Sequence, residues 1–285
     1  MKYSEMLPRP KELLRIAWRD DRTWFFLLGW LFLSLGSPAQ AQNCLESQGL
    51  RFCLIPGGSY FLGSPLHEAG RYTNEPTPYR VTLKPVYLAA TETTNAQYAR
   101  FLKATGHAAP LYWQDKNLNV PNQPVVGVSW HDAQAYCRWL TRETGITHRL
   151  PSEAEWEAAA RGGLVGEPFP WGRDLPEAGG HHRANYDSQG FANDGSAFTV
   201  PVASFPPNGY GLYDMAGNVS EWCADQCSSP EGQSPFAASN CRVRKGGSWR
   251  SQARDLRCAA RKFSPPDTAD GFIGFRVLRE IASNP

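Results

Sequence analysis

Cysteine, histidine and acidic side chains are the first candidates for chemistry in this sequence. None of the seven cysteines forms a Cys-x-x-Cys pair or has histidines at zinc-ligand spacing. His181 and His182 are adjacent, which is poor geometry for two ligands of one metal ion. Glu153, Glu155 and Glu157 share one short helical segment, where capping and solvated ion pairing explain them better than catalysis. No Ser, His and Asp set for nucleophilic catalysis is evident, so these residues predict no catalytic site.

The first 41 residues have the pattern of a secretory signal peptide. Residues 1–22 are rich in basic side chains, an apolar run covers 24–35, and a small-residue cleavage motif ends at Ala41. The apolar run is short for a bilayer core of ~30 Å, although an uncleaved membrane anchor is an alternative. We therefore expect cleavage after Ala41, a periplasmic location and a single mature domain over residues 42–285, with no stable membrane insertion after cleavage.

The composition indicates a compact, loop-rich protein. Hydrophobic residues make up 41% of the chain and aromatic residues 12%, which is enough for a sizeable core and excludes disorder for most of the chain. A net charge of +2 gives no basic excess of the kind that nucleic-acid-binding domains carry. The 26 glycines and 23 prolines predict many turns and short elements.

An exported protein is exposed to oxidising conditions, where disulfides are the usual state of cysteines. Cys44 and Cys53 flank a short segment, and Cys227 and Cys241 bracket a loop rich in Ser, Pro and Gly. These are the two most plausible pairs, although sequence alone does not determine connectivity. Because the number of cysteines is odd, one free thiol is expected.

Three amphipathic helices are expected in the first part of the domain. Apolar residues recur at helical spacing over 94–102 and again over about 130–142. A third helix begins at Ser152, whose hydroxyl can cap it while Glu155 reaches back, and it ends before a Gly-Gly pair.

Short strands are expected over residues 50–90, where apolar residues alternate with turn residues. Periodicity fades over 164–245, and disulfides or bound cations are the usual means of holding such an irregular stretch. No linker divides residues 42–285.

Six separate blocks carry the most specific pattern in the chain. They are Pro124–Trp130, Arg149–Gly163, Asn208–Trp222, Lys245–Trp249, Cys258–Arg261 and Gly274–Arg276. Together they resemble the formylglycine-generating enzyme, or sulfatase-modifying factor, family, in the family's order and across residues 50–280. The resemblance implies an α+β, C-type-lectin-like fold that is irregular and loop-rich. Fold alone does not fix activity.

The resemblance also bears on catalysis. The enzymes of this family use two cysteines, just after a Gly-Gly-Ser-aromatic block, to bind copper and activate oxygen. Here Ser251 occupies the first position, and the second has no counterpart because the segment is shorter. Cys258 matches a later, structural cysteine of the enzymes. Since a hydroxyl does not replace a copper-binding thiolate, we expect no copper and no formylglycine-generating activity.

Two structural Ca²⁺ sites are implied by the resemblance. The first would use Asn185, Tyr186, Asp194 and Ser196, and the second Asp214, Gly217, Val219 and Glu221. Oxygen-only ligand sets with one or two carboxylates suit Ca²⁺, and the ions would hold the irregular half of the chain in place. Solvated Asx turns are the alternative interpretation.

A binding groove is implied at the place of the enzymes' cleft. The residues that follow the Gly-Gly turn there are Ser248, Trp249, Arg250, Ser251 and Arg254. An aromatic ring with two arginines suits recognition of a peptide or an acidic group. The alternative is that Trp249 belongs to the core and the arginines to the solvated surface.

The resemblance implies two main classes of function. The family includes a periplasmic regulator that promotes activation of a membrane Ser/Thr kinase controlling type VI secretion. We accordingly expect a non-catalytic, exported protein that binds the extracytoplasmic part of a membrane protein, such as a Ser/Thr kinase. The alternative is a periplasmic oxidative maturation enzyme, of the kind implicated in pyoverdine maturation. A lectin-like carbohydrate binder is a third interpretation, suggested by fold analogy alone.

Overall fold

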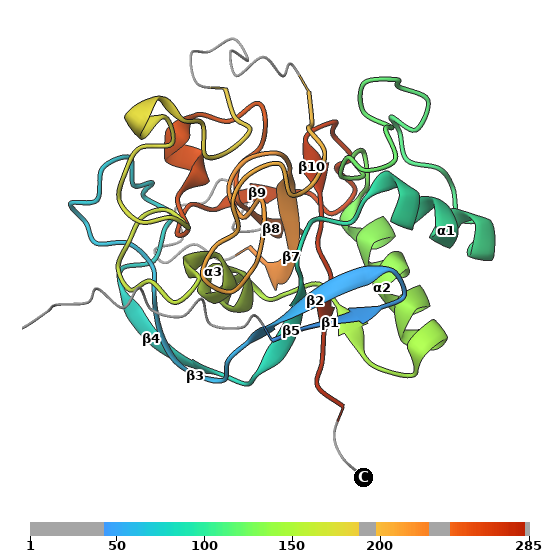
Figure 1. Ribbon diagram of the computed structural model, residues 1–285, viewed down its shortest axis with the longest axis horizontal. Coiled ribbons are helices and arrows are strands. Elements are labelled where there is room, and N and C mark those ends of the chain that lie inside the picture. Colours follow the sequence, from blue (N-terminus) through green and yellow to red (C-terminus); the bar gives the residue numbers. More distant parts are fainter. Residues whose placement is uncertain (1–42, 188–197, 228–239, 283–285) are drawn as a thin grey trace, which may run out of the picture. The chain divides into compact units, whose positions relative to one another are not determined.

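The computed structural model describes residues 43–187, 198–227 and 240–282 (Figure 1). The predicted signal peptide, residues 1–41, therefore lies outside the described residues. Across the described ranges, no helix is long and apolar enough to cross a membrane.

A five-stranded antiparallel sheet brings together strands from both ends of the domain. In spatial order its strands are β1 (Cys44–Ser47), β2 (Leu50–Ile55), β5 (Val86–Ala89), β11 (Leu278–Arg279) and β6 (His148–Arg149). Because side chains alternate along a strand, β2 contributes to two cores: Phe52 joins one cluster, and Cys53 and Ile55 join another. The sheet therefore separates two hydrophobic cores.

The second sheet lies next to α3, and its strand β8 leads into the Gly-Gly turn (Figure 1). In spatial order its strands are β10 (Ile273–Gly274), β7 (Ser220–Gln226), β8 (Arg242–Lys245) and β9 (Lys262–Ser264). The pairing of β10 with β7 is parallel, and the other two pairings are antiparallel. A separate hairpin pairs β3 (Gly58–Leu62) with β4 (Tyr79–Leu83).

The three predicted helices are confirmed. They are α1 (Asn95–Thr105), α2 (Trp130–Thr144) and α3 (Glu153–Arg161), and the first two extend slightly beyond their predicted ends. Each begins with a capping box, at Thr94, Ser129 and Ser152, which satisfies otherwise unpaired N–H groups of the first turn. Each ends at a left-handed glycine, so local sequence defines both ends of all three.

Aromatic packing joins α1 and α2, which lie side by side in Figure 1. The Tyr98 ring stacks on Tyr136 at 5.6 Å, and Phe101 meets Trp139 at 5.7 Å. Phe275, just after β10, contacts Tyr136 edge-on at 5.4 Å. Pairs of this kind contribute about 0.5–1.5 kcal/mol each beyond area burial, so this cluster fixes the helix pair on the domain.

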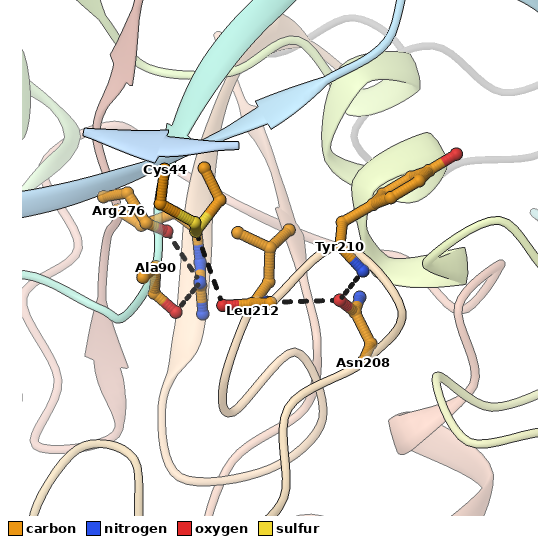
Figure 2. Close-up of a disulfide and its surroundings, with 9 residues drawn as sticks. Cys44, Ala90, Asn208, Tyr210, Leu212 and Arg276 are labelled. Atoms are coloured by element: carbon orange, nitrogen blue, oxygen red, sulfur yellow. Dashed lines mark hydrogen bonds between the residues drawn. A yellow bond between two sulfur atoms is a disulfide. The ribbon is translucent and has the colours of Figure 1, made fainter. Parts of the chain in front are cut away.

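Both predicted disulfides are present. Cys44 and Cys53 are register partners on β1 and β2, and Cys227 is bonded to Cys241. Figure 2 shows the Cys44 bridge above the loop that carries Asn208 and Leu212. Nearby, the Arg276 guanidinium donates to the Ala90 carbonyl at 3.4 Å. The first bridge therefore ties the edge strand β1 to β2, and its Cys53 sulfur lies 3.7 Å from the Gly211 carbonyl oxygen of a loop that is distant in sequence.

The remaining cysteines differ from expectation only in number. Cys137, Cys223 and Cys258 are all free and all buried, where a single leftover thiol was expected. With three short helices and scattered small sheets joined by long loops, the fold is α+β and loop-rich, as predicted.

Candidate functional site

The residues of the predicted groove follow a Gly-Gly turn at the end of β8. Gly246 and Gly247 have φ of 89° and 70°, in the region that favours glycine. A Cβ on Gly247 would come within 2.9 Å of Leu256, so this turn also requires a residue without a side chain. The sharp turn directs the chain from β8 into the segment that begins with Ser248.

Ser251, which stands where the resemblance places the first copper-binding cysteine, lies beside a second hydroxyl. Ser248 is 2% exposed, and its Oγ lies 3.2 Å from the Oγ of Ser251. Ser251 Oγ also accepts a hydrogen bond from the Ser248 backbone N–H at 3.0 Å. The pair is held in place, but its hard oxygen atoms are poor ligands for Cu(I).

The free thiols give no alternative redox centre among the described residues. Burial raises the pKa of the Cys137 and Cys258 thiols to about 12 and that of Cys223 well above its ordinary value. A buried thiol that stays protonated is neither a nucleophile nor a good metal ligand at neutral pH. These cysteines are therefore packing residues.

Trp249 is half-buried and is oriented by a hydrogen bond. Its Nε1 donates to the Gly271 carbonyl at 3.1 Å, and its ring lies 5.7 Å from that of Phe198. Arg250 is exposed, with its guanidinium carbon 5.6 Å from the Trp249 ring centroid. Trp249 is therefore not a fully buried core residue, while Arg250 and Arg254 are exposed, as the alternative interpretation expected.

Arg254 is placed differently from the other groove residues. It belongs to the 3-10 helix Ala253–Leu256, and its guanidinium carbon lies 3.8 Å above the Tyr72 ring. Tyr72 in turn donates to Asp255 at 2.5 Å. The structure thus pairs the two predicted arginines with two different aromatic rings.

The first predicted calcium site is described only in part. Asp194 and Ser196 lie outside the described residues. Asn185 is fully buried; its Nδ2 donates to the Phe198 carbonyl at 3.0 Å, but no residue in the described ranges donates to its Oδ1. Asp187, which the sequence analysis did not select, also has an unpaired buried oxygen. A buried oxygen without a donor fits a cation ligand, because leaving it unpaired is costly.

The second predicted site combines a carboxyl group that interacts with Glu92 and a carboxylate that is already paired. Asp214 accepts from the Ala203 N–H at 2.6 Å through Oδ2, and its side chain also hydrogen-bonds with that of Glu92. Glu221 receives two hydrogen bonds of 2.7 Å from Arg276 and a third, also 2.7 Å, from Trp156 Nε1. A Ca²⁺ ion bound here would have to share Glu221 with Arg276.

Glu92 is a further member of this region that the sequence analysis missed. It lies three residues after the end of β5, is 1% exposed and accepts from Asn218 Nδ2 at 3.1 Å. Burial and the neighbouring Asp214 raise the pKa of Glu92 well above its ordinary value, and burial raises that of Asp214 to about 6. Its position just after a buried strand was the available signal.

Acidic side chains outnumber basic ones in this region. The carboxyl groups of Glu92, Asp214 and Glu221 lie near the Arg276 guanidinium, and the raised pKa values of Glu92 and Asp214 reflect this crowding together with burial. Among the residues that the structure describes, no three Asp, Glu, His or Cys side chains converge as a metal-binding group. A cation would therefore have to be held mainly by amide and main-chain oxygens together with Asp214.

A two-residue loop links the groove to both predicted calcium sites. The N–H groups of Gly217 and Asn218 donate to the carbonyls of Gly246 and Asn185, both at 2.8 Å. The Asn218 carbonyl accepts from the Trp249 N–H at 3.0 Å. A Cβ on Gly217 would lie 2.3 Å from the Asn185 carbonyl oxygen, so only glycine fits this contact.

A second buried ionic cluster lies between α3 and β8. Glu157 is 2% exposed and accepts from Arg161, from Lys245 Nζ at 3.2 Å and from the Gly63 N–H at 2.8 Å. The expectation that the α3 glutamates make solvated pairs is therefore wrong for Glu157. The cluster is internally paired and has no free group for catalysis.

Comparison with known proteins gives the family. Residues 39–281 match the family model described as a sulfatase-modifying factor enzyme 1-like domain. The chain is 36% identical over 286 residues to the formylglycine-generating enzyme of Streptomyces coelicolor, which covers 79% of this chain and 88% of that enzyme. It is 41% identical over 160 residues to inactive C-alpha-formylglycine-generating enzyme 2 of Bos taurus, covering 54% of this chain and 49% of the relative.

A kinase and a solved structure complete the comparison. The chain is 35% identical over 254 residues to the serine/threonine-protein kinase pkn1 of Chlamydia pneumoniae, covering 80% of this chain but 38% of the kinase. The structure of PvdO from Pseudomonas aeruginosa is similar with a TM-score of 0.72 and 32% identity, over 84% of this chain and 98% of PvdO. The protein described here therefore belongs to the sulfatase-modifying factor, or formylglycine-generating enzyme-like, family and has its fold.

Proposed function

We propose that this chain is an exported, periplasmic, non-catalytic member of its family that binds and regulates a membrane or envelope protein. The observation that carries the proposal is Ser251, which stands where the resemblance places the first copper-binding cysteine and whose Oγ lies 3.2 Å from Ser248 Oγ. A domain that keeps the fold of an enzyme family without its catalytic thiols can still serve as a binding module. The two disulfides support a location outside the cytoplasm.

The relatives support a regulatory role of this kind. One of them is named an inactive enzyme, and in another the matching part is only 38% of a serine/threonine-protein kinase. A domain of this family therefore occurs both without activity and within a kinase. For this chain we propose the extracytoplasmic part of a membrane protein as partner, for example a Ser/Thr kinase that controls type VI secretion.

Cross-linking in the native envelope tests this function. Tagged mature protein would be cross-linked in its own envelope fraction, purified, and analysed by mass spectrometry. We expect one stoichiometric membrane protein that is lost with Trp249→Ala. Phe61→Ala is the matched control, because Phe61 is also an exposed ring beneath an arginine, on the β3–β4 hairpin. No partner, or equal loss with both variants, would refute the regulatory function.

An oxidative maturation enzyme is the alternative, and the likeness to PvdO favours it. Such an enzyme needs a redox centre. Stoichiometric copper or iron in the purified protein, removed by Ser251→Ala, would support this alternative and count against the non-catalytic proposal.

We also propose structural Ca²⁺ at the two sites above, supported by the buried Oδ1 of Asn185, to which no described residue donates a hydrogen bond. Chelation of calcium is expected to lower the melting temperature, and added Ca²⁺ at about 100 times its Kd should restore roughly 2.7 kcal/mol. The Asn185→Ala variant should no longer respond to calcium through the first site. Melting temperatures that are independent of calcium and chelator would exclude the sites.

A further inference from the structure

One face of the β8–β9 pair carries an unusual concentration of positive charge. Arg242 and Arg244 are two residues apart on β8, so they share a face of the sheet. Their register partners on β9 are Ser264 and Lys262, which lie on the same face. Figure 1 shows β8 and β9 side by side next to β7.

Aromatic rings alternate with the guanidiniums on this face. The guanidinium carbon of Arg242 lies 4.2 Å from the Trp130 ring centroid. That of Arg244 lies 5.8 Å from the rings of both Trp222 and Phe272. Arg250, at 5.6 Å from both Phe272 and Trp249, continues the series into the groove.

We call this surface the arginine face. It consists of one buried arginine, Arg244, and five residues that are at least partly accessible: Trp130, Arg242, Trp249, Arg250 and Phe272. Trp130, Arg242, Trp249 and Phe272 are half-buried, and Arg250 is exposed, so a partner can reach the face.

Arg244 is the decisive residue, because it is buried without an ion-pair partner. It is 9% exposed, and its Nε donates to Ser264 Oγ at 3.1 Å. No carboxylate of the described residues forms an ion pair with it; Asp270 is the acidic residue close enough to influence it. Burial lowers the pKa of the Arg244 guanidinium to about 10. Buried arginines are normally paired, so an anion is missing here.

The other groups on this face do not supply that anion. Lys262 is bonded to Asp255 at 2.9 Å, which occupies that carboxylate. Asp267 is exposed and lies near His131, 3.6 Å away, at the rim. Within the described residues, neither Arg242 nor Arg250 takes part in an ion pair, and the Nε of Arg242 is buried with no acceptor.

We propose that the arginine face binds an acidic segment of a partner protein, with a carboxylate reaching Arg244 and apolar side chains resting on Trp130, Phe272 and Trp249. Guanidiniums bind carboxylates through paired hydrogen bonds, and the flanking rings exclude water from these bonds. The net charge of +2 argues against a nucleic acid as occupant, since that would need a wider basic surface. This inference rests on the proposed function and specifies the chemistry of the partner.

The test uses purified mature protein with both disulfides intact. The probe is a fluorescently labelled twelve-residue peptide that alternates Glu with Leu or Ser, and the control peptide has Gln in place of Glu. We expect the Glu peptide to bind, the Gln peptide to bind at least tenfold more weakly, and affinity to fall with added salt. Equal affinity for both peptides would overturn the proposal.

Variants locate the binding. Arg242→Ala and Arg244→Met should each weaken the Glu peptide about tenfold, as expected for loss of a charge-assisted hydrogen bond. Arg80→Ala is the matched control, since Arg80 covers the Phe61 ring at 4.9 Å on the distant hairpin. Circular dichroism and urea unfolding confirm that each variant is folded; if Arg244→Met is not, Arg242→Ala decides. An equal loss with Arg80→Ala would show non-specific attraction and overturn the proposal.

The inference and the proposed function fail in different ways. Capture of a membrane partner through Trp249, with no binding of the Glu peptide at any salt concentration, overturns the acidic-segment inference and leaves the regulatory function. Peptide binding that depends on Arg242 and Arg244, with no captured partner, supports the inference and counts against the envelope partner.

Discussion

Two neighbouring residues of β8, Arg244 and Lys245, are both buried and have opposite surroundings. Lys245 is 1% exposed and lies 3.2 Å from Glu157 and 3.8 Å from Glu153, on the face that packs against α3. Arg244 faces the other way and has no carboxylate partner among the described residues. Burial alone therefore does not distinguish a structural charge from a binding charge; whether the protein itself supplies the counter-charge does.

The largest expected loss of stability concerns the face of β8 that packs against α3, where Lys245 is paired with glutamates. Glu157→Ala would leave Lys245 and Arg161 buried without their shared carboxylate, so we expect a loss of about 3–5 kcal/mol in the free energy of unfolding. Urea unfolding at neutral pH measures it. A loss below about 1 kcal/mol would show that the two faces do not differ in the way described.

The stability that Glu157 contributes should also depend on pH. Burial by itself would raise the pKa of Glu157, but Lys245, Arg161 and the Gly63 N–H together hold it below its ordinary value of 4.5. The stability that this carboxylate contributes is fully present above about pH 4.5, the ordinary pKa of a glutamate. It is lost as the pH falls through the lower pKa that Glu157 has in the folded protein.

The measurement for this effect is urea unfolding of the native protein and Glu157→Gln between pH 7 and pH 3. The difference in unfolding free energy between the two should shrink as the pH falls. A difference that stays constant would contradict the assignment of a depressed pKa to Glu157.

The smallest change in stability is expected at Arg244, on the arginine face. Arg244→Met removes a buried charge that has no ion pair and keeps much of its volume, so the unfolding free energy should stay within about 1 kcal/mol of the native value or rise. The same urea measurement at neutral pH applies. A loss as large as that of Glu157→Ala would mean that Arg244 has a structural role.

The helices were predictable because their signals are local. Thr94, Ser129 and Ser152 cap helices whose ends are set by glycines a few residues further on, and the two disulfides follow from short spacings. The buried ion pairs around Glu157 and Arg276 were not predictable from the local sequence pattern. Glu157 obtains Lys245 from a strand 88 residues away, and a glutamate on a helix surface has the same local pattern as one beneath a sheet.

The candidate site was predictable in part for a related reason. The family blocks placed Trp249 and Ser251 correctly in one turn, since these residues are contiguous in sequence. Neither Arg244 nor Glu92 stood out, because what distinguishes them is the presence or absence of partners brought by distant segments.

The loop of Gly217 and Asn218 has a thermodynamic consequence. Its backbone bonds tie the Asn185 segment, the glycine turn and Trp249 into one unit, with a glycine contact too close for any side chain. If an ion at Asn185 and a partner at Trp249 both depend on this loop, their binding free energies are coupled. Such coupling is reciprocal: the factor by which calcium strengthens partner binding equals the factor by which the partner strengthens calcium binding.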